Sequence, residues 1–276
     1  MDGINHCKAL WLKLAFKPKK IVEMNRVQSE FEVWGTIVFI ECASSTVSKE
    51  QLQQGIQAAL VFCQDVDELF STYKEGSQIS QLRRGEISIE NCEERVKEVW
   101  QLCTQARDLS DGAFDPWAVP GGFDPSGLVK GWAADNCANI LLAAGAEHIH
   151  VNAAGDLALR GGFFDEITQS VQPWSIGVIN PENKMEVLQV FTITDGAIAT
   201  SGTYERGAHI TDPYTGLIAI GAKSATIVGP NGALCDALAT AVMVAGKDSA
   251  IWFSQSELSE YRPWVIERHE NLSWTI

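Results

Sequence analysis

The sequence predicts an α+β protein, because helical and strand patterns are grouped along the chain and do not strictly alternate. Helical patterns dominate the first half, and short runs rich in β-branched and aromatic residues dominate after Gly145. Strict alternation would instead indicate a doubly wound parallel sheet. The 276 residues are 46% hydrophobic and contain no repeat or low-complexity linker. We therefore expect a single domain over residues 24–276.

The first half is expected to hold one strand and three helices. Ser48 and Gln51 form a capping box, after which apolar residues follow helical spacing. Two further helices end at glycine turn signals, the second of them at Gly145. The expected elements are a strand over 32–42 and helices over 48–70, 92–106 and 125–145.

The second half is expected to form strands, with two helices near its end. Residues 231–246 (NGALCDALATAVMVAG) predict a buried helix, and 247–258 predict a second one. A last strand follows at 263–269. The other expected strands lie at 148–151, 157–161, 174–179, 187–194, 197–202 and 220–229.

The composition of the chain argues against some classes of function and indicates a cellular compartment. The formal net charge of −14 argues against a surface that binds nucleic acid. The seven cysteines are scattered without a Cys-x-x-Cys pair, which is typical of reduced, buried thiols and predicts a cytoplasmic protein. We find neither a secretory signal pattern nor an apolar run of about 18 residues that could span a membrane. Residues 1–23 form a basic arm that either packs on its own domain or contacts a membrane surface or partner.

Asp236 is the exceptional residue of the predicted helix 231–246. It stands among apolar residues, where a carboxylate is costly unless a cation or a hydrogen-bond donor compensates it. Thr240 lies four residues on and projects from the same face, so the two offer the hard oxygen donors that Mg²⁺ prefers. The alternative is that Asp236 serves the amides and the dipole of its own helix N-terminus.

Residues 121–135 (GGFDPSGLVKGWAAD) are a candidate phosphate site. Asp124 and Pro125 predict an N-cap and a first helical position, which would leave the backbone amides of 126–128 free. Lys130 follows one turn later, and free amides beside a lysine can hold a phosphate. The alternative is a well-capped core helix with a solvated Lys130.

Three further candidate residues, His209, Asp115 and Asp156, occur at turn signals. His209 lies in a segment (199–216) dense with polar and turn residues, where it is either a general base or a structural loop histidine. Asp115 and Asp156 each follow a turn signal, and both have a plain turn explanation.

Together these segments resemble the ApbE family, the FAD:protein FMN transferases. The resemblance implies an α+β, T-fold-related domain in which an antiparallel sheet is packed with helices. The motifs that carry it are VWGT from residue 33, VDELFSTYKEGSQISQL from 66, DGAFDP from 111, DPSGLVKGWAAD from 124, VNAAGDLALRG from 151, WSIGVINP from 174, AIATSGTYERGAHITDPYTG from 197 and CDALATAVMVAG from 235.

The resemblance also implies a set of site residues. Mg²⁺ would be held by Asp236, Thr240 and a backbone carbonyl near Gly127, and would bridge the FAD diphosphate. Asp236 and His209 would be the catalytic residues, with His209 beside the reacting phosphate. The residues implied to line the FAD site are Trp34, Tyr73, Ala113, Phe114, Asp115, Asp124, Lys130 and His209.

The implied reaction is Mg²⁺-dependent transfer of FMN from FAD to a Ser or Thr hydroxyl of a target flavoprotein, with release of AMP. Two alternatives stay open at this point. A Mg²⁺-dependent FAD pyrophosphatase would use the same metal and phosphate site, with water as the acceptor. A non-catalytic flavin-binding protein would bind FAD without turnover.

Three positions depart from the pattern of the family. Trp34 stands where the family usually has Met, so the contact there is expected to differ. Ala154 replaces the first glycine of the usual Gly-Gly-Asp, which affects how closely the backbone can approach a ligand. Only two residues separate Arg206 from His209, where many relatives carry a longer hairpin, and this difference bears on docking of the target.

Overall fold

The structure, a computed structural model, describes residues 21–180, 182–202, 210–268 and 273–275. The helices are α1 (Lys49–Phe70), α2 (Gln78–Arg83), α3 (Glu94–Leu109), α4 (Ser126–Ala143) and α5 (Gly232–Ala245), with short 3₁₀ helices η1 (Ile89–Asn91), η2 (Gly246–Ser254) and η3 (Ser256–Leu258). The strands are β1 (Asn25–Val33), β2 (Thr36–Ser44), β3 (His148–Ala153), β4 (Asp156–Arg160), β5 (Phe163–Asp165), β6 (Ser170–Gln172), β7 (Trp174–Asn180), β8 (Asn183–Ile193), β9 (Gly196–Gly202), β10 (Ala222–Gly229), β11 (Arg262–Glu267) and β12 (Ser273–Thr275).

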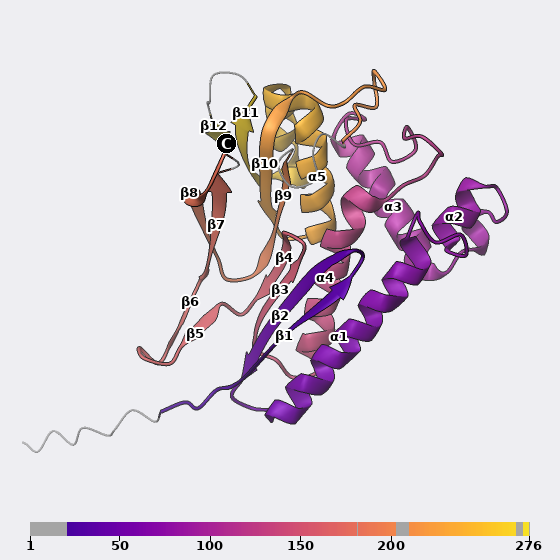
Figure 1. The fold of residues 1–276 in the computed structure, drawn as a ribbon. Coiled ribbons are helices and arrows are strands. Elements are labelled where there is room, and N and C mark those ends of the chain that lie inside the picture. Colours follow the sequence, from indigo (N-terminus) through magenta and orange to yellow (C-terminus); the bar gives the residue numbers. More distant parts are fainter. Residues whose placement is uncertain (1–20, 181, 203–209, 269–272, 276) are drawn as a thin grey trace, which may run out of the picture.

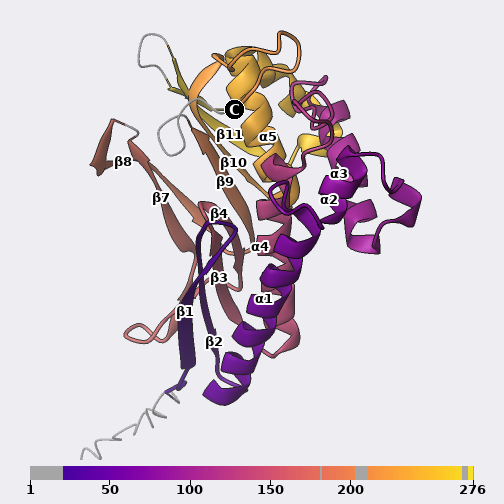
Figure 2. The same ribbon diagram turned by 45° about the vertical axis from the view of Figure 1, so that its right-hand side comes forward.

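An antiparallel sheet forms the centre of the molecule. Within the described residues it has eight strands in the order β1-β2-β3-β4-β9-β10-β11-β12. Helices α1, α4 and α5 cover one face, and the hairpins β5–β6 and β7–β8 stand on the other side (Figure 1). The view in Figure 2 shows β7 and β8 projecting away from the helices. The predicted α+β class, with an antiparallel sheet packed with helices, is confirmed.

The sheet is covered on both faces because alternate residues of its strands point in opposite directions. On β4, Ala158 belongs to the apolar core beneath α1 and α4. Its neighbours Leu157 and Leu159 instead pack with Trp174 of β7. A strand buried on both faces carries no alternating polar pattern, which explains the continuous apolar run of β4.

The strand expected over 32–42 is wrong as a single element. It spans the end of β1, a turn and most of β2, and the two strands pair as a hairpin from Val33 with Thr36 outward. Trp34 and Gly35 form the turn, with φ of 56° and 66°. Glycine adopts this left-handed backbone readily, whereas a bulky tryptophan rarely does. The β-propensity of Trp34 therefore hid the turn.

The predicted helix boundaries hold for most of the chain. The Ser48 side chain accepts from the Gln51 amide, and the Gln51 side chain accepts from the Ser48 amide, so α1 begins with the expected capping box. The chain turns at Gly145 after α4 in the left-handed conformation, with φ of 93°. The segment expected as a helix over 247–258 consists of the 3₁₀ helices η2 and η3.

Three further expectations concern the cysteines, membrane-spanning helices and the N-terminal arm. The six cysteines within the described residues are all buried, and no disulfide joins them. No helix of the described chain is long and apolar enough to cross a membrane. Residues 1–20 of the predicted basic arm lie outside the described residues, and the division into an arm and one domain stays a prediction.

Candidate active site

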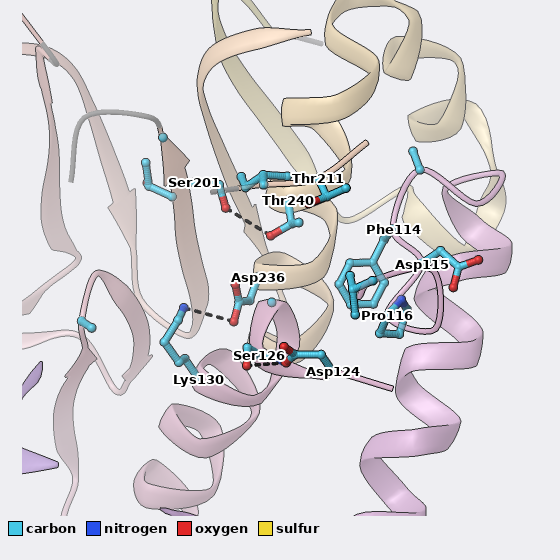
Figure 3. Close-up of a pocket in the computed structure, with 17 residues that line it drawn as sticks. Phe114, Asp115, Pro116, Asp124, Ser126, Lys130, Ser201, Thr211, Asp236 and Thr240 are labelled. Atoms are coloured by element: carbon cyan, nitrogen blue, oxygen red, sulfur yellow. Dashed lines mark hydrogen bonds and ion pairs between the residues drawn. The ribbon is translucent and has the colours of Figure 1, made fainter. Parts of the chain in front are cut away.

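A pocket opens where α4 begins, beside the middle of α5 and the end of β9. Its volume within the described residues is about 250 Å³. Figure 3 shows Lys130 of α4, Asp236 and Thr240 of α5 and Ser201 of β9 near one another, with Phe114 at their side. The lining residues are Ala113, Phe114, Asp115, Pro116, Val119, Asp124, Ser126, Gly127, Lys130, Ala154, Thr200, Ser201, Gly202, Ile210, Thr211, Asp236 and Thr240.

The first turn of α4 differs from the predicted cap. Pro125 is the N-cap, and the carboxylate of Asp124 accepts from the Ser126 amide at 3.0 Å. The Leu128 amide donates to the Pro125 carbonyl at 2.9 Å, so the expectation of three free amides is wrong at Ser126 and Leu128. Gly127 leaves helical geometry, with φ −84° and ψ 16°. Backbone amides therefore contribute less to anion binding here than the sequence predicted.

Three ionisable side chains from different elements form the charged floor of the pocket, where Lys130 and Asp236 line the cavity and Asp156 contacts Lys130 from outside the lining. Asp156 and Asp236 are 2% and 3% exposed. The ammonium of Lys130 forms an ion pair with Asp156 and lies 3.3 Å from Oδ2 of Asp236. Figure 3 shows Lys130 reaching from α4 toward Asp236 on α5. One cation thus contacts two buried carboxylates, and together the three side chains carry a formal charge of −1.

The donors that compensate Asp236 come from α4. Besides Lys130, the backbone amide of Gly131 donates to Oδ2 at 3.3 Å. The N-terminus of α5 is capped by Asn231, whose side chain accepts from the Leu234 amide at 2.9 Å. The interaction of Asp236 with its own helix N-terminus, the alternative in the sequence, is therefore not the arrangement in the structure.

Two glycines allow the backbones of α4 and α5 to come into direct contact. A Cβ atom on Gly131 would clash with the carbonyl of Gly232, and one on Gly232 would lie 2.5 Å from the carbonyl oxygen of Gly131. Asp135, one turn further along α4, accepts from the Gly232 amide at 2.5 Å and from Arg160 at 2.8 Å. The close approach of the Gly131 and Gly232 backbones places Lys130 beside Asp236.

Hydroxyl groups form the wall next to Asp236. The Thr240 hydroxyl lies 3.4 Å from the hydroxyl of Ser201 at the end of β9 (Figure 3). A Cβ atom on Gly127 would lie 3.2 Å from Thr240 Oγ1, so the backbone of α4 passes close to this hydroxyl. Among the described residues, no three His, Cys, Asp or Glu side chains group closely enough to hold a metal ion. A cation here would need hydroxyl, carbonyl and ligand oxygens besides Asp236.

The rim of the pocket is acidic, but its carboxylates have cationic partners. Asp115 pairs with Arg107 at 2.9 Å, and Asp124 lies 3.7 Å from Arg83. The Tyr214 hydroxyl donates to the Asp111 carbonyl at 2.7 Å, which ties the segment after β9 to the turn before Ala113. Burial, together with the charges of Asp111, Asp212 and Asp115, raises the pKa of Tyr214.

Eight of the predicted site residues line this one pocket, two described ones do not, and one lies outside the described residues. The indole of Trp34 donates to the Cys63 carbonyl at 3.0 Å and packs against the core. Tyr73 is 97% exposed and is absent from the lining described above. His209 lies outside the described residues. The residues that line the pocket are Ala113, Phe114, Asp115, Asp124, Gly127, Lys130, Asp236 and Thr240.

The sequence interpretation missed several residues at the pocket. Asp156, explained there as a turn residue, is part of the charged floor. Ser201 and Thr211 also line the pocket. In the sequence they stand before and after residues 203–209, which lie outside the described residues. Ala154 also lines it and has φ of 57°, the left-handed backbone that its glycine counterpart would adopt without strain. The sequence signals for Asp156 were its position directly after a two-residue turn and its position as the aspartate of the family's Gly-Gly-Asp pattern, and neither pointed to Lys130.

Comparison with known proteins identifies the family. The model of the ApbE family matches residues 34–121 and 118–262, which is more than half of the chain. This chain belongs to the ApbE family. The FAD:protein FMN transferase of Vibrio cholerae is 33% identical over 135 residues, 45% of this chain and 39% of that protein. The protein of the same name from Rhodobacter capsulatus is 33% identical over 133 residues, 45% of this chain and 24% of that protein. The chain thus spans about two fifths or less of these relatives.

Solved structures of ApbE proteins share the fold. The ApbE protein of Thermotoga maritima is 25% identical, with a TM-score of 0.77 over 91% of this chain and 96% of that one. The flavin transferase ApbE from Vibrio cholerae is 20% identical, with a TM-score of 0.76 over 92% of this chain and 97% of that one. The ApbE fold therefore extends over almost the whole chain.

Proposed function

We propose that this ApbE protein is a Mg²⁺-dependent FAD:protein FMN transferase, which moves FMN from FAD to a Ser or Thr hydroxyl of a target flavoprotein and releases AMP. The observation that carries the proposal is the meeting of Lys130 of α4 with Asp236 and Thr240 of α5 at one pocket, although Lys130 and Asp236 are 106 residues apart in the sequence. The relatives named FAD:protein FMN transferase support the substrate and the reaction class.

The pocket chemistry fits a divalent cation with a diphosphate. Asp236 offers a buried carboxylate, Thr240 a hydroxyl and Gly127 a nearby backbone carbonyl, which are hard oxygen donors. The formal charge of the floor is −1, so a cation is favoured there even though the chain as a whole is acidic. Bound Mg²⁺ would neutralise the diphosphate and stabilise the departing phosphate.

The side chains of the chain itself have distinct proposed tasks. Lys130 donates to a diphosphate oxygen, while Asp124 and the segment of Ala113, Phe114 and Asp115 border the dinucleotide. His209 takes the proton of the acceptor hydroxyl. The hydroxyl oxygen then forms a new bond to the FMN-side phosphorus, the bridging P–O bond to the AMP phosphate breaks, and AMP leaves. Trp34 and Tyr73 remain proposed FAD contacts, although neither lines the described pocket.

The proposal extends to the compartment of the target. Buried, unbridged cysteines are typical of reducing compartments, and the described cysteines are of this kind. We therefore place the reaction and its target flavoprotein in the cytoplasm. Cell fractionation with an antibody against the chain tests this, and recovery in the periplasm or culture medium would contradict it.

The decisive experiment is incubation of the chain with FAD, MgCl₂ and a candidate flavoprotein that carries an acceptor threonine. Transfer predicts flavin that stays on the denatured target, in amounts equal to the AMP released. Free FMN and AMP without labelled target would instead identify a pyrophosphatase. FAD binding without AMP release would identify a non-catalytic flavin-binding protein.

A further inference from the structure

We infer that Asp156 is a positioning residue: it holds Lys130 aside so that Asp236 stays available to a divalent cation. This inference rests on the proposed function, because it concerns the same pocket. Asp156 begins β4 and is almost completely buried, and it pairs with the ammonium of Lys130. The contact of this ammonium with Asp156 is shorter than its contact with Asp236.

The competition is for one oxygen atom. The Lys130 ammonium and the Gly131 amide both contact Oδ2 of Asp236. If Lys130 had no second carboxylate, it would form a close, neutral pair with Asp236 in a buried setting, where such a pair is strong. A cation would then have to compete with the ammonium for the charge of Asp236. Asp156 removes much of this competition.

The backbone fixes where Asp156 holds the ammonium. Asp156 is paired with Ala153 across the β3–β4 turn, and β4 is hydrogen-bonded to β3 and β9 on its two sides. The side chain of Asn152 accepts from the Gly155 amide at 2.8 Å, which braces the turn. Asp156 therefore stays in place, and the flexible Lys130 side chain is the part that adjusts.

The test is a titration with Mg²⁺ in which binding of FAD to the full chain is monitored by flavin fluorescence anisotropy. This measurement needs no turnover. We expect Asp156→Asn to raise the Mg²⁺ concentration for half-maximal FAD binding about tenfold or more, in the range known for residues that orient metal ligands. Asp156→Glu keeps the carboxylate and should stay within about threefold of the unsubstituted chain. Glu41→Gln is the matched control, because Glu41 pairs with Arg26 outside the pocket.

A double variant separates positioning from simple loss of charge. Lys130→Met with Asp156→Asn removes the ammonium that competes for Asp236 together with the carboxylate that holds this ammonium, and it leaves Asp236 as the charged member of the three. We expect its Mg²⁺ requirement to stay within about threefold of the unsubstituted chain, even though its FAD affinity falls. This variant also serves the test if Asp156→Asn alone does not fold.

Three results would overturn the inference. An unchanged Mg²⁺ requirement in Asp156→Asn would show that Lys130 does not compete for Asp236. A requirement raised about tenfold in the double variant would show that Asp156 acts through its own charge. If FAD binding by the unsubstituted chain does not respond to Mg²⁺, the proposed function itself fails and this inference fails with it.

Discussion

The two ends of α4 have different surroundings although they belong to one helix. At its start, Lys130 and Gly131 face buried carboxylates, and the backbone leaves helical geometry at Gly127. Toward its end, Cys137 and Leu141 are apolar, fully buried and packed in the core with α1 and β3. The apolar end anchors the helix and so allows the polar end to hold costly charges. Substitutions at the two ends should therefore separate activity from stability.

The largest effect is expected at the polar end. Asp236→Asn keeps the shape of the side chain but removes the charge that attracts a divalent cation, so AMP release from FAD should fall at least about a thousandfold. The thermal unfolding midpoint should change little, because an amide oxygen can still accept from the Gly131 amide. Unchanged AMP release by this folded variant would remove Asp236 from the mechanism.

The apolar end should show the opposite behaviour. Leu141→Ala leaves a cavity at a fully buried position and should lower the free energy of unfolding by about 3 kcal/mol, measured by urea denaturation. Its FAD affinity should be retained under conditions where the variant is folded. Leu142→Ala is the control, because Leu142 is 43% exposed and should cost about 0.5 kcal/mol or less. Loss of FAD binding in folded Leu141→Ala would argue against the division between the two ends.

Gly131→Ala is expected to change both the stability of the chain and its Mg²⁺ requirement for FAD binding. Its methyl group would clash with the Gly232 carbonyl, so α4 and α5 must separate, at a cost of about 2 kcal/mol in unfolding free energy. The same shift moves Lys130 away from Asp236 and should raise the Mg²⁺ requirement for FAD binding. Gly76→Ala serves as the control, because no atom lies within 4 Å of the added methyl group. Equal stability of the two variants would show that the helix contact yields easily.

The smallest expected effect is a gain in stability. Ala154→Gly relieves a left-handed alanine in the β3–β4 turn and should raise the free energy of unfolding by about 0.5 kcal/mol, since the added freedom of the unfolded chain offsets part of the relief. Ala153→Gly, in the neighbouring strand, should instead destabilise the chain. Thermal unfolding measures both, and destabilisation by Ala154→Gly would mean that the turn is not strained.

Local sequence signals predicted the elements that depend on neighbours in the chain. The capping box at Ser48 and the apolar spacing after it place α1 correctly, because all its determinants lie within a few residues. The turn at Trp34 and the break at Gly127 were missed, because each depends on a backbone conformation that the residue type alone does not indicate.

The sequence predicted which residues line the pocket better than it predicted how these residues contact one another. The motifs at Asp124, Lys130 and Asp236 are recognisable one by one, and the resemblance to a family joined them before the structure placed them at one pocket. The pairing of Lys130 with Asp156 had no such signal. Periodicity reports neighbours within an element, whereas this ion pair joins a helix and a strand that meet only in the folded chain. The roles of these residues stay predictions.

The sequence separation within the pocket has a consequence for biosynthesis. Asp115 and Asp124 leave the ribosome long before Thr240, and α5 is needed to complete both the floor and the hydroxyl wall. A nascent chain that ends before α5 therefore exposes half a cavity and an unshielded sheet face, at a stage when compact folding is not yet available. A chain that ends before α5 lacks Asp236 and Thr240, so under the proposed function it should be made without the capacity to bind the nucleotide.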